Sequence, residues 1–419
     1  MVSTIEQSSG YSATDRIRNS LSIFAISGYP CLLISNSANF IGFQVRLMAQ
    51  AWLVLETTNS TFNVGLVNAT PALVLMLLSP FGGVLADRFN RKSIALVGRF
   101  LVAAVSFVAA YLVAVNRIEI WHLITMGPIL GTGMALSNPA SQTIVMDLVG
   151  RDRMISAMSL NTTLSNLGTM LGPAIGGILV AAYGNQSVFI LTAAVSGVSF
   201  FALLGLPNLK PPVSKGRPGW RAGFDDMAAG ISYTIKTPNA RWLVFAVTGA
   251  LYWGMIQPII PYYARDVLDV GSSGYGLLLG LSGAGSMATA IFMFLAGDLP
   301  RKGLMVIGSI AIVSISYSLF ATSSSFPLSL AIMCVAGVGG GVWMTAVFSL
   351  LQTAVDDNMR GRVMGFALAA LQLYGLGFLL SGFLAETIGA ELTLHITAAL
   401  WFLSGLLAFV RSPELRNLN

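Results

Sequence analysis

One segment of the sequence places polar side chains on a single face of an apolar helix. Between residues 30 and 55 the spacing is three or four positions, which is that of one helical face: Asn36, Asn39, Phe43, Arg46 and Gln50. A guanidinium suits a carboxylate, a phosphate or another anionic oxygen. Within an apolar helix, one interpretation of Arg46 is therefore a functional contact with such an anionic group. The alternative is that it pairs with backbone carbonyls or extends toward the membrane surface.

A second group of charged side chains interrupts the apolar sequence at residues 82–98, GGVLADRFNRKSIALVG. It contains Asp87, Arg88, Arg91 and Lys92, in a chain where only 10% of residues are charged. An Arg-Lys pair recurs at residues 301–302, and Lys302 follows Lys92 by 210 residues. Such charges either anchor the chain at a membrane surface or form ion pairs that open and close.

The composition is too apolar for a soluble protein and indicates that most of the chain lies in a lipid bilayer. The 419 residues are 55% hydrophobic with a mean hydropathy of +0.76, more than one soluble core accommodates. A transmembrane helix needs about 20 mostly apolar residues, and the runs are continuous rather than alternating. We therefore predict an all-α membrane protein with twelve transmembrane helices, at roughly 30–55, 62–82, 93–115, 121–142, 154–181, 187–206, 242–263, 274–296, 303–322, 327–352, 363–385 and 392–411.

The longest polar connection divides these helices into two groups of six. We expect an N-terminal six-helix bundle (1–206), a cytoplasmic linker (207–241) and a C-terminal six-helix bundle (242–419). The second part of the linker has apolar residues at near-helical spacing, which predicts an amphipathic helix at the membrane surface: Trp220, Phe224, Met227, Ile231 and Ile235.

The distribution of basic residues predicts the orientation. With twelve helices, 20 of the 23 Lys and Arg residues, Arg99 among them, fall on the side of the two termini. Only Arg117 and Arg265 fall on the other side, and Arg46 lies within a span. The positive-inside rule then predicts a multi-pass protein of the plasma (bacterial inner) membrane with both termini in the cytoplasm.

Glycine patterns repeat between the two halves. Gly127 and Gly131 match Gly337 and Gly341 at an offset of 210, and GPAIGG (172–177) matches GFLLSG (377–382) at an offset of 205. Related six-helix halves are typical of secondary transporters, whose substrate site lies at the midplane between them. Single matches also arise by chance, because small residues commonly mediate helix packing in membranes.

The charged loop resembles motif A of the major facilitator superfamily, G-x-L-x-D-R-x-G-R-K. The matching residues are Gly83, Asp87, Arg88, Arg91 and Lys92, with Asn90 in place of the second Gly. Asn tolerates the left-handed conformation, so we expect the turn to persist. A second group resembles the antiporter motif (motif C) of the superfamily's exporters: Gly168, Gly172, Pro173, Gly176 and Gly177. Segments 138–149 and 360–365 resemble the enterobactin-exporter and drug-efflux branch.

The resemblance implies roles for the charged loop. Asp87 would lie near the N-terminus of the eleventh span, near Val363, and would close a cytoplasmic gate; a carboxylate there gains about 0.3–1 kcal/mol. Arg91 would pair with Asp147, and Lys92 would serve only as a topology anchor. Arg88 and Gly83 complete the predicted gate.

The resemblance also implies that the first span lines a central cavity. Besides Asn39, Arg46 and Gln50, the candidate cavity residues are Asn161, Ser165, Trp253, Gln257, Trp343, Gln372 and Tyr374. Aromatic residues in membrane helices serve more often for packing or as interface anchors. Together these side chains indicate an amphiphilic small-molecule substrate.

The energy source is inferred by exclusion and by resemblance. The chain has no G-x-x-x-x-G-K-[ST] loop for ATP, and the resemblance implies protons as the coupling ion. Midplane acids are lacking: Glu386 and Glu391 flank an outer loop, and His395 is interpreted as a packing residue. Without H-E-x-x-H or G-x-S-x-G motifs we expect no enzyme. We also expect no cofactor, no metal, no nucleic-acid partner and, by resemblance, a monomer in the lipid bilayer.

These observations predict a secondary active transporter that exports siderophore-like or drug-like amphiphilic molecules by alternating access. Two alternatives remain within transporters, a flippase-like lipid or lysolipid carrier and an uptake carrier of an anionic metabolite. A receptor or scaffold would not require the repeated halves.

Overall fold

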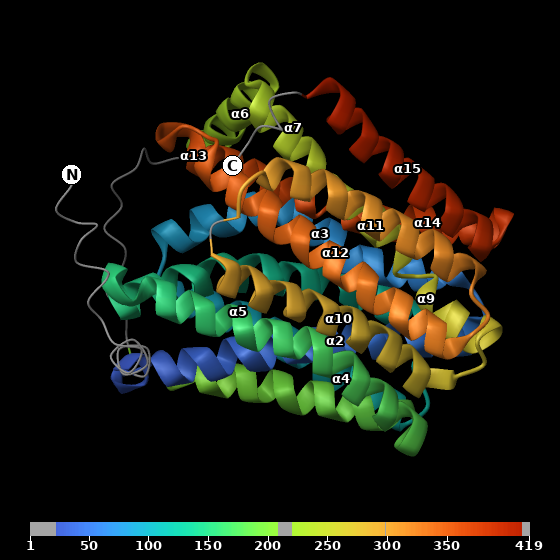
Figure 1. The fold of residues 1–419 in the computed structure, drawn as a ribbon. Coiled ribbons are helices and arrows are strands. Elements are labelled where there is room, and N and C mark those ends of the chain that lie inside the picture. Colours follow the sequence, from blue (N-terminus) through green and yellow to red (C-terminus); the bar gives the residue numbers. More distant parts are fainter. Residues whose placement is uncertain (1–21, 208–219, 298, 413–419) are drawn as a thin grey trace.

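The computed structural model describes residues 22–207, 220–297 and 299–412, and every regular element in these ranges is a helix (Figure 1). Nine helices in these ranges are long and apolar enough to cross a membrane. The elements are η2 (Ser22–Ala25), α2 (Tyr29–Thr58), α3 (Thr61–Arg88), α4 (Arg91–Ala114), α5 (Ile120–Leu204), α6 (Trp220–Lys236), α7 (Pro238–Val247), α8 (Gly249–Ile256), α9 (Ile260–Tyr262), η3 (Tyr263–Val267), α10 (Gly271–Ala296), α11 (Lys302–Thr322), α12 (Phe326–Thr353), α13 (Asp357–Leu371), α14 (Tyr374–Ile388) and α15 (Ala390–Arg411).

The number of passes through the membrane depends on two glycines in α5. A straight helix of its 85 residues would be about 130 Å long, several times the thickness of a bilayer core. Gly150 (φ 70°, ψ 176°) and Gly184 (φ 75°, ψ 174°) interrupt it with backbone conformations that only glycine adopts readily. The chain reverses there, so α5 contains three of the predicted spans, and the arrangement is consistent with twelve.

Two predicted spans are broken rather than continuous. The span predicted at 242–263 consists of α7, α8, α9 and the π-helix η3, and Pro258 and Pro261 lie where it is interrupted. Proline lacks the N–H that a continuous helix requires. The span predicted at 363–385 divides into α13 and α14 at Gln372 and Leu373. Both breaks lie beside the central cavity described below.

The repeated glycines occupy equivalent places in the two sets of helices. Gly127 and Gly131 of α5 pack against α3, and Gly337 and Gly341 of α12 pack against α10. The second motif behaves in the same way, since Gly177 of α5 lies against Gly276 of α10. In each case a Cβ atom would come within about 3.0 Å of the facing helix, so close backbone approach explains the glycines.

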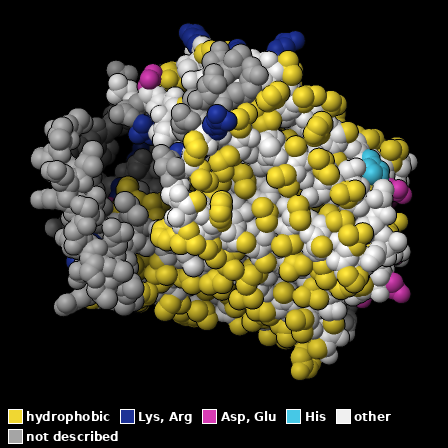
Figure 2. Space-filling view, viewed as in Figure 1, with side chains coloured by type: hydrophobic (Ala, Val, Ile, Leu, Met, Phe, Trp, Pro, Cys, Tyr) yellow, Lys and Arg dark blue, Asp and Glu magenta, His cyan; other side chains and the backbone are white. Residues whose placement is uncertain are grey.

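The surface separates apolar and charged side chains. Apolar side chains cover most of the visible face, whereas Lys and Arg gather near α6; acidic side chains appear both at the opposite side and beside this basic group (Figure 2). We call the end with the connections at Asn90, Gly150, Arg301 and Asp356 the basic end. The end with the connections at Asn59, Asn116, Gly184 and Asp269 is the far end.

The predicted linker helix is present as α6, although the side chains of its residues 220–227 lie outside the described part. Its last turns contact the start of α13: Tyr233 Oη donates to Asp356 Oδ2 at 2.9 Å. A Cβ on Gly230 would lie 2.7 Å from the Arg362 carbonyl oxygen. The helix is therefore packed against the bundle at the basic end.

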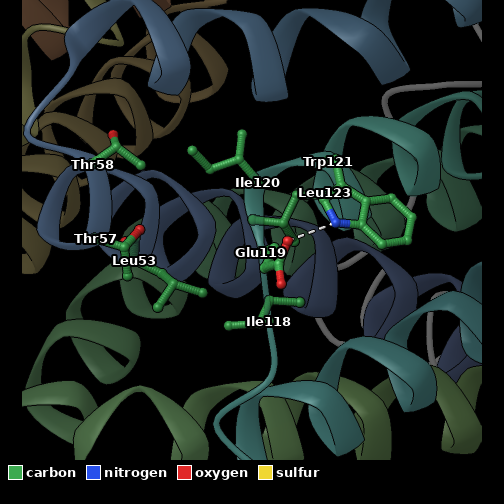
Figure 3. Close-up of a pocket in the computed structure, with 8 residues that line it drawn as sticks. All are labelled: Leu53, Thr57, Thr58, Ile118, Glu119, Ile120, Trp121 and Leu123. Atoms are coloured by element: carbon green, nitrogen blue, oxygen red, sulfur yellow. Dashed lines mark hydrogen bonds between the residues drawn. The ribbon is translucent and has the colours of Figure 1, made fainter.

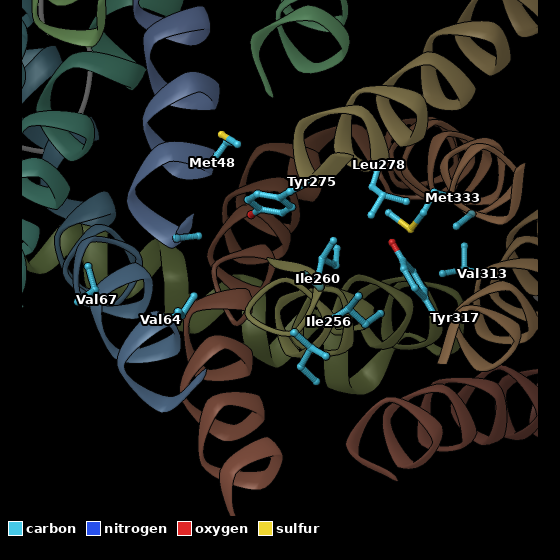
Figure 4. Close-up of a cluster of buried hydrophobic side chains, with 14 of the residues drawn as sticks. Met48, Val64, Val67, Ile256, Ile260, Tyr275, Leu278, Val313, Tyr317 and Met333 are labelled. Carbon is cyan, nitrogen blue, oxygen red and sulfur yellow. The ribbon is translucent and has the colours of Figure 1, made fainter. Parts of the chain in front are cut away.

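The two sets of helices pack closely at the far end and diverge at the basic end. At the far end, Gly65 of α3 lies against the Phe378 carbonyl, and Gly382 of α14 lies against Thr61. Figure 4 shows Val64 of α3 among the apolar side chains of this region, near Ile256 and Ile260.

At the basic end, Gly83 of α3 and Gly365 of α13 have no described atom within 4 Å of an added Cβ. A cavity of about 600 Å³ separates these helices, and its lining includes Ser79, Asn138 and Gln372. The cavity between the two sets of helices is therefore open toward the basic end.

Gly337→Val tests whether close backbone approach holds the helices together. The new side chain would collide with the Ser282 carbonyl of α10, and overpacking costs about 1–3 kcal/mol. We expect the Tm of the purified protein in detergent to fall by about 2–4 °C for each kcal/mol lost. Gly340→Val is the matched control on the same helix, because no described atom lies within 4 Å of its Cβ. Equal loss in both variants would contradict this explanation.

Candidate functional site

Four of the predicted cavity residues come together around Arg46. A cavity of about 160 Å³ is lined by residues of α2, α3, α5, α8 and α14, including Arg46, Gln50, Trp253, Tyr374 and Asn68. Gln50 Nε2 donates to Asn68 Oδ1 at 3.4 Å, which holds the amide of Gln50 beside α3. Asn68 was not predicted from the sequence, because a single Asn in an apolar span carries no periodic signal.

The Arg46 side chain is almost fully buried yet lacks an acidic partner. It is 9% exposed, and its Cζ lies 5.8 Å from the ring centroid of Phe43. Among the described residues, no hydrogen bond or ion pair to its guanidinium is present. A buried cation with only an aromatic neighbour is costly unless a ligand or water reaches it. The predicted alternative, pairing with backbone carbonyls, is therefore not what the structure shows.

A second, more apolar cavity of about 360 Å³ adjoins the first and shares Leu47, Trp253 and Tyr374 with it. Two further predicted residues, Gln257 and Trp343, line it. Its other lining side chains are mostly apolar or aromatic, among them Met48, Tyr317, Met333, Met344 and Trp401. Among the described residues, no acidic side chain lines either cavity. Together the two cavities present one cation, several amides and a large apolar wall.

The remaining predicted cavity residues lie elsewhere. Asn39 is half-buried and lines neither cavity, and Gln372 lines the cavity at the basic end instead. Asn161 and Ser165 also line neither, but Thr169 and Pro173 of the same pass do. Thr169 follows Ser165 by one helical turn toward the far end; i, i+4 spacing identifies a helical face but not its depth.

Arg99 is a second buried cation that the sequence interpretation missed. It had been counted with the basic residues of the cytoplasmic side, but it lies in the third turn of α4 and is 3% exposed. Its Nη2 donates to Asn36 Oδ1 at 3.0 Å and to Ser141 Oγ at 3.5 Å. Asn36, assigned to the cavity stripe, therefore binds Arg99. Arg99 is thus a second buried cation within an apolar helix, α4.

The charged loop at the basic end is a set of helix-terminal contacts. Arg91 Nη1 and Asp147 Oδ2 form an ion pair at 2.5 Å, as the motif A resemblance implies. Lys92 Nζ donates to the carbonyls of Leu204, at 3.1 Å, and Leu206. Lys92 thus caps the C-terminal end of α5, which is more than a topology anchor does. Arg88 is exposed, and the side chain of Asp87 lies outside the described part of the chain.

Asn90 acts differently from the prediction. It has φ −60° and ψ 114°, so it does not adopt the left-handed conformation. Instead its Oδ1 accepts from the backbone N–H groups of Lys92 and Ser93, at 3.0 and 3.3 Å. Asn is among the best N-cap residues, and this explains its place before α4.

The motif C glycines bring α5 against two neighbours. Gly168, Gly172 and Gly176 face α2 at Phe40, Gln44 and Met48, while Gly177 faces α10. In the same pass, the carbonyl of Pro173 lies against Gly276.

His395 is interpreted from the sequence as a packing residue. Its Nδ1 lies 2.9 Å from Ser318 Oγ, within hydrogen-bond distance.

A separate hollow of about 430 Å³ lies on the far end, between α2 and the start of α5 (Figure 3). Its one acidic side chain, Glu119, accepts from Trp121 Nε1 at 2.8 Å. The Thr57 and Thr58 hydroxyls there donate to carbonyls of their own helix. None of the predicted substrate-binding residues lines this hollow, so the central cavities are the better candidate site.

Known proteins resemble this chain along most of its length. The multidrug efflux pump Tap of Mycolicibacterium fortuitum is 24% identical over 401 residues, covering 93% of this chain and 97% of that protein. The enterobactin exporter EntS of Shigella flexneri is 26% identical over 339 residues, covering 77% and 78%. Among solved structures, the nucleoside transporter NupG has a TM-score of 0.76 at 13% identity, covering 92% of this chain and all of that one.

A bacterial homologue of the human lysosomal transporter Spinster, solved in an inward-facing and unoccupied conformation, has a TM-score of 0.70 at 14% identity and covers 92% and 98%. These likenesses and the helical fold define a membrane transporter of the major facilitator superfamily, a class of transport proteins and not of enzymes. A family model described as transmembrane secretion effector matches residues 19–418, and the chain belongs to that family.

Asn90 substitutions distinguish an N-cap from a left-handed turn. We expect Asn90→Ala to lower the stability of the purified protein by about 1 kcal/mol, because two N–H groups of α4 lose their acceptor. Asn90→Asp keeps the acceptor and should leave the Tm unchanged. A left-handed turn would instead make Asn90→Gly the most stable variant, and that ranking would contradict the N-cap.

Proposed function

We propose that this protein exports small amphiphilic organic molecules by alternating access, with protons as the coupling ion. The observation that carries the proposal is the guanidinium of Arg46, which lines a central cavity formed by α2, α3, α5, α8 and α14 and has no acidic partner among the described residues. A transporter of hydrophobic cations would place an acid there. An arginine fits a carboxylate, phosphate or other anionic oxygen.

The two adjoining cavities suggest how such a substrate binds. The anionic group would lie against Arg46, and the amides of Gln50 and Asn68 would accept or donate hydrogen bonds beside it. The apolar body would extend past Trp253 and Tyr374 into the larger cavity, toward Trp343. An efflux pump and a siderophore exporter among the similar proteins support an export function.

The direction of opening follows from the same proposal. We assign the basic end to the cytoplasm, with both termini there and the protein in the bacterial inner membrane. Lys and Arg concentrate at this end, and the positive-inside rule places such an end in the cytoplasm. The open basic end would then be the loading side. Asp87, at the end of α3, would meet the N-terminus of α13 only after this cavity has closed.

Proton coupling would not use an acid at the midplane. No carboxylate among the described residues lines either central cavity, so a proton carried by the substrate, or competition between protons and Arg46 for an anionic substrate, would replace one. We propose a monomer with the small molecule and the lipid bilayer as its partners.

Arg46→Ala tests the cation in the cavity. In a bacterial host without its own efflux pumps, the wild type should lower the accumulation of some anionic, neutral and cationic compounds. A hydrogen bond to a charged group is worth about 1.5–3 kcal/mol, so the variant should lose export of anionic compounds about 10- to 100-fold. Neutral compounds should be affected much less.

Gln257→Ala is the control for Arg46→Ala, since it changes a lining residue without removing charge. Equal loss for all compound classes would contradict the assigned role of Arg46. If the wild type exports none of the compounds despite normal membrane expression, the exporter proposal fails. A dedicated lipid carrier or an uptake carrier of an anionic metabolite would then be the better hypothesis.

Asp87→Asn tests the gate at the basic end. We expect export to fall about two- to fivefold at unchanged expression, because the closed basic end loses a carboxylate at the N-terminus of α13. Asp269→Asn is the control, because it removes an exposed acid at the far end, where Asn tolerates the same φ of 48°. Normal export by Asp87→Asn would exclude the gate.

A further inference from the structure

The turn between α2 and α3 is contacted by two charged side chains from the C-terminal helices. Glu386, at the end of α14, accepts a hydrogen bond from Ser60 Oγ at 2.9 Å and another from the Phe62 backbone N–H at 3.3 Å. Ser60 is the N-cap of α3, so this carboxylate lies on the N-terminus of that helix. The sequence interpretation had treated Glu386 only as a residue flanking an outer loop.

Arg265 contacts the other side of the same turn. Its Nη1 donates to the Leu55 carbonyl and to Asn59 Oδ1, both at 2.9 Å. Asn59 is the C-cap of α2, so the guanidinium lies at the C-terminus of that helix. Asp266 accepts from Nε at 3.0 Å and from Nη2 at 3.0 Å, which leaves Nη1 directed at α2.

The signs of these charges match the helix ends that they contact. The last carbonyls of a helix carry partial negative charge and favour a cation, whereas the first N–H groups carry partial positive charge and favour an anion. Arg265 meets the carbonyl end of α2, and Glu386 meets the N–H end of α3. One turn thus receives a cation and an anion, each from beyond residue 260 of the chain.

Both contacts exist only while the far end is closed. They join helices that precede residue 207 to helices that follow residue 237, at the end where Gly65 and Gly382 also bring α3 and α14 together. Opening of the far end separates these helices and exposes the turn to water. The full free energy of these contacts therefore favours the conformation with the far end closed over the conformation with it open. This holds even though exposed ion contacts add little to the free energy of folding.

We propose that Glu386 and Arg265 form a two-charge clamp on the α2–α3 turn, and that this clamp sets how often the far end opens. Each charge at a helix end is worth about a two- to fivefold change in an equilibrium constant. The clamp complements the proposed Asp87 contact. Asp87 would join α3 to α13 at the basic end, and Glu386 joins α14 to α3 at the far end. The proposal requires alternating access but no particular substrate.

The accessibility of reporter cysteines to a labelling reagent tests the proposal, because it reports how often each end opens without a transport assay. Two reporters are made in full-length protein with Cys31 and Cys334 replaced by Ser: Val64→Cys, fully buried near α8 and α9 (Figure 4), and Ser79→Cys, in the cavity at the basic end. The probe is a water-soluble maleimide applied to purified protein. Glu386→Gln should speed labelling of the Val64→Cys reporter about two- to fivefold and slow that of the Ser79→Cys reporter. Arg265→Gln should act in the same direction.

Glu391→Gln is the matched control, because it removes the same charge in the first turn of α15, at the same end of the bundle. It should leave both labelling rates unchanged. Unchanged rates in Glu386→Gln and Arg265→Gln would overturn the clamp, and so would equal changes in Glu391→Gln. Faster labelling of both reporters would mean loosened packing and would also overturn it. Because no substrate is used, the outcome is independent of the export assay.

Discussion

The hydrocarbon solvent imposes the constraint on which the rest of this structure depends. Every backbone N–H and C=O within it must be paired, so the chain crosses as helices. Helices in lipid gain little from apolar contact with each other and associate where small side chains allow close approach. The glycines of α5, α10, α12 and α14 supply that approach in equivalent places. Breaks in helices, as between α8 and α9 or α13 and α14, lie beside the central cavities.

Two arginines inside the bundle show how the same chemistry serves different purposes. Arg99 is bound by Asn36 and Ser141 in the interior of the N-terminal helices, where it stabilises their packing. Arg46 lines a cavity, and among the described residues its guanidinium has no hydrogen-bond or ion-pair partner; the ring centroid of Phe43 lies 5.8 Å away. Desolvation disfavours both cations, but Arg99 recovers part of that cost from fixed partners. For Arg46, a bound ligand would have to offset the desolvation cost. This difference supports its proposed role in binding an anionic substrate.

Several of the specific polar contacts outside the cavities lie at helix ends. Asn90 caps the start of α4, Lys92 caps the end of α5, and Glu386 and Arg265 cap α3 and α2 from the opposite half. The contacts of Asn90 and Lys92 lie within the N-terminal helices and would persist during the proposed alternating access. The contacts of Glu386 and Arg265 join helices before residue 207 to helices after residue 237, so under that proposal they distinguish the conformations. An interaction that is present in only one of two conformations shifts the equilibrium between them by its full free energy, even if that free energy is modest.

The sequence by itself determined the fold class, the membrane-spanning helical character and the family, because apolar length, glycine spacing and motif A are local patterns. It also identified Arg46, Gln50, Trp253 and Tyr374, since polar and aromatic residues within apolar runs stand out without a structure. Only the tertiary structure decided that Arg99 is buried, that Asn36 binds it, that Asn90 is an N-cap and that Thr169 rather than Ser165 reaches the cavity. It alone joined Glu386 and Arg265 to one turn. The physical reason is that depth in the membrane, rotation of a helix and the choice of partner depend on contacts between distant segments, which periodicity along one helix does not specify.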